Sequence, residues 1–317
     1  MKKIMIITLM TFISLVGCSA GAGEGNIQSV GMLVETTVHD QAWGQKGYKG
    51  LLEIKDEYDV DVYFKEGITS QAEVNKAVDE LADKGVKIIF GHSSTYGEHF
   101  QRIHESFPEI QFIYFNGGFT AENVTSLNFS ANAMGFFGGV VAGGMTETNQ
   151  VGIIAAHEWQ PEVEGFFEGV NYENPDADIH LNFVGSWDDK EKALQLYQMM
   201  EKTEADVFYP TGDSFSSLII QEIQDDGNFA IGYVNDQSNL GKNTVLTSTV
   251  QNVEVLYIDA MEKAVNGELP GDVIEYDFKE NAISMGAFSD QVPDALKEKV
   301  QGYIESYKAT GKLPYEN

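Results

Sequence analysis

Short apolar runs alternate with longer amphipathic stretches along most of the chain, and this alternation constrains the fold more than any other feature. The first series has predicted strands over 27–34, 60–64, 86–91 and 111–115, and predicted helices over 41–58, 70–84 and 99–106. The second series has predicted helices over 131–145, 160–171, 190–202 and 216–225, and predicted strands over 151–155, 180–184, 207–209 and 229–234. Strands that alternate with helices form parallel sheets covered by helices. The sequence therefore predicts an α/β protein with two lobes around a cleft.

Two local signals add detail to these predicted helices. Ser70 and Glu73 have the spacing of a capping box at the start of one helix, and Gly85 is placed to end it. The segment 131–145 is apolar and rich in glycine. Glycine lowers helix stability, so this helix is expected to pack very closely on its neighbours.

The loops that follow the predicted strands are the expected place for a ligand, because open parallel sheets bind ligands beyond the carboxyl ends of their strands. These loops are 35–44, 91–97, 115–119, 155–161, 185–189, 210–215 and 234–239. Four large aromatic residues fall in them: Trp43, Trp159, Trp187 and Phe215. Any one of them could belong to the core. As a group they favour a cleft that holds a planar or sugar-like ligand between aromatic faces and a few polar groups.

The chain offers no pattern of catalytic or metal-binding residues. It lacks GxSxG, HExxH, Walker and GxGxxG motifs, and its six histidines are scattered without metal-ligand spacing. We therefore expect no enzyme activity, no catalytic residues, no metal site and no cofactor.

The N-terminus predicts export and a lipid anchor. Two lysines and an apolar run precede the sequence LVGC, which matches a bacterial lipobox ending at Cys18, the single cysteine of the chain. The alternatives are an uncleaved anchor and an ordinary signal peptide in which the cysteine occurs by chance. The prediction is a lipoprotein signal peptide over 1–17, a flexible tether over 18–26, and a mature protein anchored at the outer face of the cytoplasmic membrane.

The charge balance excludes some partners. The chain has 20 Lys and Arg against 49 Asp and Glu, a formal net charge of -29, and Arg102 is its single arginine. A nucleic-acid surface must neutralise several phosphates with basic side chains. Direct nucleic-acid binding is therefore not expected, and an anionic ligand such as a nucleotide is disfavoured.

Several segments together resemble the basic membrane protein (BMP, PnrA-like) family of bacterial surface lipoproteins. They are DQAWGQKGYKG over 40–50, MGFFGG over 134–139, ADVFY over 205–209, IGYVNDQ over 231–237 and VLTSTVQNV over 245–253. The resemblance covers 27–315 and implies a two-lobed fold like that of type I periplasmic binding proteins, in which each lobe is a parallel sheet flanked by helices. It also implies three crossings between the lobes, with lobe one over 27–127 plus 250–276 and lobe two over 128–249 plus 277–317. Several members of the family bind purine nucleosides for ABC importers.

The family resemblance also implies a set of ligand-binding positions. In the first loop Asp40 is kept, and Trp43 stands where the family has the phenylalanine that stacks on the base. Asn116 replaces the aspartate that closes the fourth strand, and Phe215 is the candidate for the second stacking ring. Trp159 joins this set as a further aromatic residue of the loops.

Two departures from the family pattern concern the ribose. The first aspartate of the family motif is Val234 here, although Asp236 and Gln237 are kept, and the later lysine is Gln251. Losing both partners of an ionic clamp lowers the expected affinity for a ribose diol. Either the ligand differs from an ordinary nucleoside, or the cleft does not serve transport.

Two functions follow from the resemblance. One is a solute-binding lipoprotein that takes up a nucleoside-like or other small aromatic and polar molecule and delivers it to an ABC transporter permease. The other is a regulatory lipoprotein, like a Bacillus subgroup that positively regulates competence, which acts through a partner and not by binding DNA.

Overall fold

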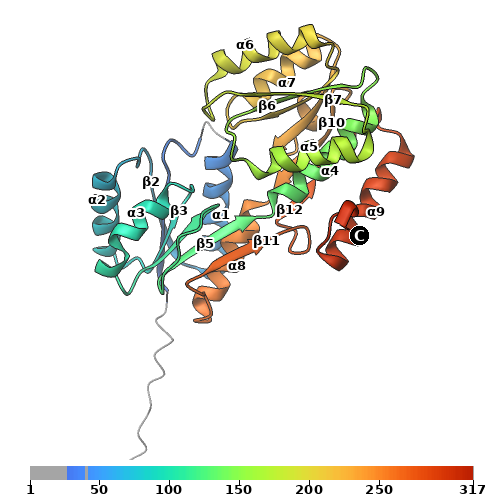
Figure 1. Cartoon of the computed structure of the whole chain (residues 1–317). Coiled ribbons are helices and arrows are strands. Elements are labelled where there is room, and N and C mark those ends of the chain that lie inside the picture. Colours follow the sequence, from blue (N-terminus) through green and yellow to red (C-terminus); the bar gives the residue numbers. More distant parts are fainter. Residues whose placement is uncertain (1–26, 40–41, 317) are drawn as a thin grey trace, which may run out of the picture.

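The computed structural model describes residues 27–39 and 42–316, and it arranges them as two lobes (Figure 1). Each lobe contains a six-stranded sheet. All strand pairs are parallel except the pairing of β10 with β12. The predicted fold class is confirmed.

Lobe one is built on a sheet with the strand order β11-β5-β4-β3-β1-β2. Its helices cover both faces of the sheet, with α2 and α3 on one face and α1 and α8 on the other (Figure 1). The elements of lobe one are β1 (Ser29–Leu33), α1 (Ala42–Tyr58), β2 (Asp61–Lys65), α2 (Gln71–Ala82), β3 (Ile88–Gly91), α3 (Tyr96–Ile103), β4 (Gln111–Phe115), β5 (Val124–Phe129), α8 (Val253–Val265) and β11 (Val273–Tyr276).

Lobe two has the strand order β12-β10-β9-β8-β6-β7. Apart from β12 and β11, the two orders are the same, so the second series repeats the topology of the first. The elements of lobe two are α4 (Ala131–Met145), β6 (Gln150–Ala155), α5 (Pro161–Glu173), β7 (Asp178–Phe183), α6 (Lys190–Met200), β8 (Val207–Thr211), α7 (Ser216–Asp225), β9 (Phe229–Val234), β10 (Val245–Gln251), β12 (Ile283–Met285) and α9 (Asp294–Thr310).

The chain passes between the two lobes at three places in the described residues. It leaves lobe one after β5, returns between β10 and α8, and leaves again between β11 and β12. Each crossing begins at the carboxyl end of a strand, β5, β10 or β11. Backbone hydrogen bonds link the crossing segments in pairs, from Ser130 to Tyr276 and from Asn252 to Ala282.

Close packing of α4 against α5 explains the glycine-rich segment. A Cβ atom on Gly135 would lie 2.0 Å from the carbonyl oxygen of Glu162, and one on Gly139 would lie 2.1 Å from that of Phe166. The reverse holds for Gly169, whose Cβ would lie 2.0 Å from the carbonyl oxygen of Phe136. The two backbones therefore touch, as the sequence predicted, and only glycine fits at the contact.

Local predictions were mostly close to the observed elements. Ser70 and Glu73 form the predicted capping box at α2. The helix predicted over 99–106 is wrong in position, because α3 begins at Tyr96 and its last residues form a separate 3-10 turn over His104–Ser106. Strands β5 and β10 and the elements after 251 were not predicted individually.

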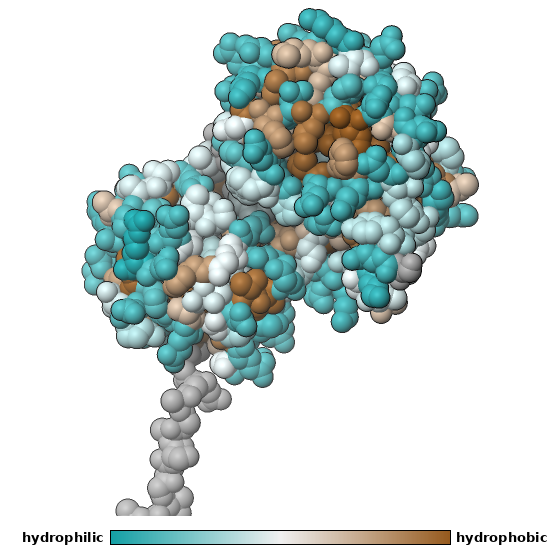
Figure 2. Space-filling model, in the orientation of Figure 1, coloured by the Kyte–Doolittle hydropathy of each residue, from teal (hydrophilic) through white to brown (hydrophobic). Residues whose placement is uncertain are grey.

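Hydrophilic residues cover much of the face shown in Figure 2, with an apolar area on lobe two. Exposed large apolar side chains of lobe two include Phe167, Leu181 and Met199. Among the described residues, no helix combines the length and the apolar character that crossing a membrane requires.

Candidate functional site

A cavity of about 420 Å³ lies between the lobes, at the carboxyl ends of strands from both sheets. Lobe one contributes 34–36, 43–44, 92–94, 116, 128–129 and 275, and lobe two contributes 131, 159–162, 187–188, 213, 233–234 and 251. In each sheet the strand order reverses at the first strand of the series, which is β1 in lobe one and β6 in lobe two. The segments that follow these strands and their neighbours β3 and β8 meet at the cavity. This is the switch point at which open α/β sheets bind ligands.

Trp43 and His92 form the floor of the lobe-one side and hold each other in place. Their rings stack with centroids 4.6 Å apart and planes at 12°. The indole N–H of Trp43 donates to the carbonyl oxygen of His92 at 3.1 Å. The imidazole Nε2 of His92 lies 2.8 Å from the carbonyl oxygen of Trp43, so Nε2 must carry the proton and donate. The stack occupies one face of the indole, and Trp43 still lines the cavity.

His92 is neutral in this arrangement. It is buried, and burial lowers its pKa to about 4, against a smaller opposite effect of the hydrogen bond to Trp43. With the proton on Nε2, Nδ1 accepts, and the hydroxyl of Tyr257 lies 3.1 Å from it. Tyr257 belongs to α8, which packs on α1. A neutral histidine therefore fixes the tryptophan against the core of lobe one.

Lobe two contributes a second aromatic group. Trp159 is 60% exposed, stacks on His157 at 5.1 Å and 11°, and meets the edge of Trp187 at 5.6 Å. Both tryptophans line the cavity. A tryptophan that exposes this much apolar surface beside a cavity offers a planar ligand a stacking partner.

A buried carboxylate lies at the base of the lobe-two side. Glu162, in the first turn of α5, is 4% exposed and lines the cavity. Its Oε1 accepts from the hydroxyl of Tyr233 at 2.7 Å and from Nε2 of Gln160 at 2.9 Å. Burial and the charge of Glu162 raise the pKa of Tyr233 well above its usual value, so this hydroxyl keeps its proton and donates. The sequence analysis missed Glu162, because an acid in the first turn of a helix is ordinarily explained by the helix dipole.

One hydrogen bond joins the two lobes directly across the cavity. The backbone N–H of Trp43 donates to Oδ1 of Asp213 at 3.1 Å. Asp213 lies in the loop after β8 and also lines the cavity. The backbone of Trp43 therefore contacts lobe two directly.

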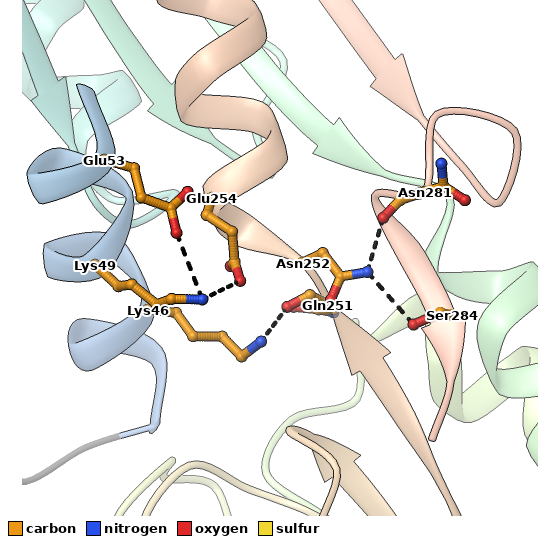
Figure 3. A network of polar contacts seen from close by, with 8 residues as sticks. All are labelled: Lys46, Lys49, Glu53, Gln251, Asn252, Glu254, Asn281 and Ser284. Carbon is orange, nitrogen blue, oxygen red and sulfur yellow. Dashed lines mark hydrogen bonds and ion pairs between the residues drawn. The ribbon is translucent and has the colours of Figure 1, made fainter. Parts of the chain in front are cut away.

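A polar network surrounds the crossing between β10 and α8 (Figure 3). The ammonium of Lys46 donates to the carbonyl oxygen of Gln251 at 2.6 Å, and Lys49 pairs with Glu254 at 2.8 Å. Burial lowers the pKa of Lys46, although the charge of Glu254 acts against this. Because Lys46 points to the crossing, it does not line the cavity in the described structure.

Four of the seven predicted ligand-binding residues line the cavity together: Trp43, Asn116, Trp159 and Gln251. Asn116 has a positive φ of 54°, which asparagine tolerates, and its side-chain oxygen accepts from the N–H of Phe129 at 3.3 Å. Asp40 and Cys18 lie outside the described residues.

Two expected site residues lie elsewhere. Phe215 is 0% exposed and packs in the core of lobe two, beneath its own loop, where a Cβ on Gly212 would lie 2.0 Å from its ring. Asp236 turns away to accept the N–H groups of Ser238 at 3.0 Å and Ala287 at 3.1 Å. Neither lines the cavity. The two side chains turn away from the cavity, and a loop position in the sequence does not say which way a side chain turns.

Val234 stands where the resemblance places a ribose-binding aspartate. It lines the cavity with a φ of 63°. A β-branched residue in the left-handed region is strained, by about 1–3 kcal/mol. The backbone conformation thus suits an aspartate or asparagine better than the valine that is present.

Within the described residues, no group of three or more His, Cys, Asp or Glu side chains could hold a metal ion. The site offers aromatic faces, carboxylates, amides and hydroxyls, groups whose chemistry suits contacts with an organic molecule.

The sequence of the chain is similar to a family model and to proteins of known name. The family model described as ABC transporter substrate-binding protein PnrA-like matches residues 27–316. The chain is 45% identical over 313 residues to the transcriptional activator protein med of Bacillus subtilis (strain 168), covering 99% of this chain and 98% of that protein. It is 23% identical over 340 residues to the ABC transporter nucleoside-binding protein BmpA of Lactococcus lactis subsp. cremoris (strain MG1363), covering 95% of each.

Solved structures share the architecture. The crystal structure of a transcriptional activator of the comK gene from Bacillus halodurans superposes with a TM-score of 0.85 at 45% identity, covering 90% of this chain and 99% of that one. Solute-binding proteins of ABC transport systems have the same two-lobed fold, that of type I periplasmic binding proteins.

Proposed function

Because the chain belongs to the Bmp, PnrA-like family of ABC transporter substrate-binding proteins, we propose that it is a lipid-anchored receptor outside the cell. It closes its lobes on a nucleoside-like or similarly small aromatic and polar molecule and presents it to an ABC transporter permease. The observation that carries the proposal is the cavity between the lobes, to which both lobes contribute an indole ring.

The geometry fits a planar ring held between the lobes. Trp43 is fixed by its stack and its two hydrogen bonds with His92, so it loses little freedom when a ligand arrives. Trp159 lies exposed on the opposite lobe. Hinge closure around a ligand is the usual motion of two-lobed receptors. The likeness to the nucleoside-binding protein of Lactococcus lactis supports this class of ligand.

Titration calorimetry with adenosine, inosine, guanosine and uridine tests the binding function. A dissociation constant below about 10 µM for at least one nucleoside is expected, with a loss of at least tenfold in both Trp43→Ala and Trp159→Ala. Tyr315→Ala serves as the control, because Tyr315 is 46% exposed and lies outside the cavity. If no nucleoside binds, or if the two tryptophan variants bind like the control, the nucleoside-like ligand class is wrong.

The anchor is tested separately, since Cys18 lies outside the described residues. Cells that express the full chain should retain it in the membrane fraction, and Cys18→Ser should release it or leave its signal peptide uncleaved. Equal membrane retention of Cys18→Ser with normal processing would contradict lipid attachment at this residue.

A second function, regulation of competence through a partner, is favoured by two observations. The relative at 45% identity over 99% of the chain is named a transcriptional activator, and Val234 and Gln251 replace the ribose-binding pair that the family resemblance implies. A reporter for competence genes in a strain lacking the protein distinguishes the two functions. Loss of expression that Cys18→Ser cannot restore would support action from the membrane. Specific DNA binding by the purified protein would contradict action through a partner.

A further inference from the structure

We infer that the cavity selects a ligand carrying a positive charge, an organic cation with a flat ring, over neutral or anionic molecules of the same shape. This inference names the ligand's charge class and rests on the proposed binding function of the same site.

The first observation is the sign of the charges around the cavity. Five carboxylate side chains line it: Glu35, Glu162, Asp188, Asp213 and Glu275. They come from both lobes, and no lysine or arginine is among the described residues that line the cavity. A concave site lined by one sign of charge concentrates the opposite charge within it.

The second observation is the state of Glu162. Glu162 as a residue is 4% exposed, and its carboxylate forms no ion pair with any residue that the structure describes. Both hydrogen bonds that it accepts, from Tyr233 and Gln160, end on Oε1. In the described part of the chain Oε2 accepts none, and the residue faces the cavity. A buried carboxylate without a counter-charge is costly, and a ligand cation would supply the missing partner.

Two lysine side chains donate to backbone carbonyl oxygens. Lys46 is directed to the carbonyl oxygen of Gln251 at 2.6 Å, and Lys192 to that of Val184 at 2.6 Å. The carboxylates of lobe one are also held by neutral donors: Glu35 accepts from the hydroxyl of Thr95 at 2.5 Å. The contact with Thr95 orients Glu35 without cancelling its charge.

The third observation is the aromatic surface. Trp43, Trp159 and Trp187 line the same cavity as Glu162, and tryptophan is the ring that best attracts a cation over its face. A metal ion is a poor match, because no three acidic or histidine side chains among the described residues converge on one point. A delocalised organic cation can use both kinds of group at once, with its ring against an indole and its charge toward Glu162.

A two-by-two set of probes tests the inference by calorimetry. Nicotinamide riboside and 1-methylnicotinamide carry a fixed positive charge on the ring. Dihydronicotinamide riboside and nicotinamide are their neutral counterparts. We expect each cation to bind at least tenfold more tightly than its neutral counterpart, with an advantage that shrinks as salt is raised.

A pair of variants on one helix links the preference to the carboxylate. Glu162→Gln keeps an acceptor for Tyr233 and removes the charge, so the difference between cation and neutral probe should fall to less than threefold. Glu164→Gln removes the same charge two residues along α5, at an exposed position outside the cavity, and should leave the difference unchanged. If Glu162→Gln does not fold, the comparison of cationic and neutral probes on the unaltered protein still decides whether the cavity prefers a cation.

The outcomes separate this inference from the proposed function. Ribosides that bind equally well with and without charge, and better than the free bases, would overturn the inference and leave the nucleoside-like ligand standing. Cations that bind equally well with and without ribose would support the inference and contradict the nucleoside-like class. No binding of any of the four probes would overturn the inference alone, because the titrations with adenosine, inosine, guanosine and uridine decide the proposed function separately.

Discussion

The indole N–H of Trp43 donates to the carbonyl oxygen of His92 while the imidazole N–H of His92 donates back to the carbonyl oxygen of Trp43, at 3.1 and 2.8 Å. This reciprocal pair joins the first turn of α1 to the loop after β3 and sets the position of the ring that lines the cavity. Disturbing either residue should therefore affect binding through the other.

Gly47→Ala should displace the ring without touching the cavity. A Cβ at this position of α1 would lie 2.6 Å from the imidazole of His92, and the stacked pair would have to shift. We expect a fall of about 1–3 kcal/mol in the free energy of unfolding and at least tenfold weaker binding of the proposed ligand. Urea unfolding and calorimetry measure the two effects, with Gln45→Ala on the exposed side of the same helix as the control. Unchanged affinity in Gly47→Ala would contradict the positioning role of His92.

The stability of the protein should fall in mild acid because of His92. The unfolded chain takes up this proton near pH 6.5, whereas in the folded protein burial lowers the pKa to about 4. Between these values the unfolded state binds more protons, so the free energy of unfolding decreases as the pH drops, by about 3 kcal/mol in all.

Urea titrations between pH 7 and 4.5 check this slope. His92→Asn should be less stable than the parent at pH 7 and should lose less further stability on acidification. The pKa of His157 is lowered by burial as well, but this residue is partly exposed, so His157→Asn should change the slope less. Parallel pH profiles for His92→Asn and the parent would refute the assignment.

Asp213→Ala should favour separation of the lobes. It removes the charged acceptor of the hydrogen bond from the backbone of Trp43, which spans the two lobes. A hydrogen bond to a charged group contributes about 1.5 kcal/mol or more, which corresponds to roughly tenfold in affinity. Calorimetry and small-angle X-ray scattering measure affinity and opening. Asp225→Ala, at an exposed position at the end of α7, should change neither.

Val234→Asp should favour ribose. The valine has a φ of 63°, a conformation that aspartate tolerates better, and it lines the cavity. The added carboxylate can accept from a ribose diol, so we expect at least tenfold tighter binding of inosine and little change for 2′,3′-dideoxyinosine. An equal gain for both nucleosides would show that the effect comes from charge or strain and not from the diol.

Two glycine substitutions should have opposite effects on stability. Gly139→Ala would bring a methyl group to 2.1 Å from the carbonyl oxygen of Phe166, forcing α4 and α5 apart, and should cost about 3 kcal/mol or more. Gly302→Ala lies in α9, where nothing is within 4 Å of the new Cβ, and should stabilise by about 0.5–1 kcal/mol. Thermal unfolding compares the two; a mild effect of Gly139→Ala would mean that the helices can separate easily.

The sequence alone determined the architecture of this protein. Alternating apolar and amphipathic stretches specify parallel strands and covering helices, since burial must follow the period of each element. The glycines of 131–145 indicated close packing, and Ser70 with Glu73 marked the start of α2, because these are interactions within a few residues or on one helix face. The same logic placed Trp43 and Trp159 beside a cleft, as strand ends of a parallel sheet meet at one edge.

Only the tertiary structure decided which way the loop side chains turn and what they meet. Phe215 and Trp159 both follow strands of lobe two, yet one ring lies in the core and the other is exposed at the cavity. In the sequence, Glu162 is an ordinary acidic residue in the first turn of a helix. In the structure it accepts a hydrogen bond from Tyr233, 71 residues away. The pairing of Trp43 with His92 and with Asp213 likewise joins distant segments. Such contacts depend on the relative placement of whole elements, which the local sequence pattern does not contain.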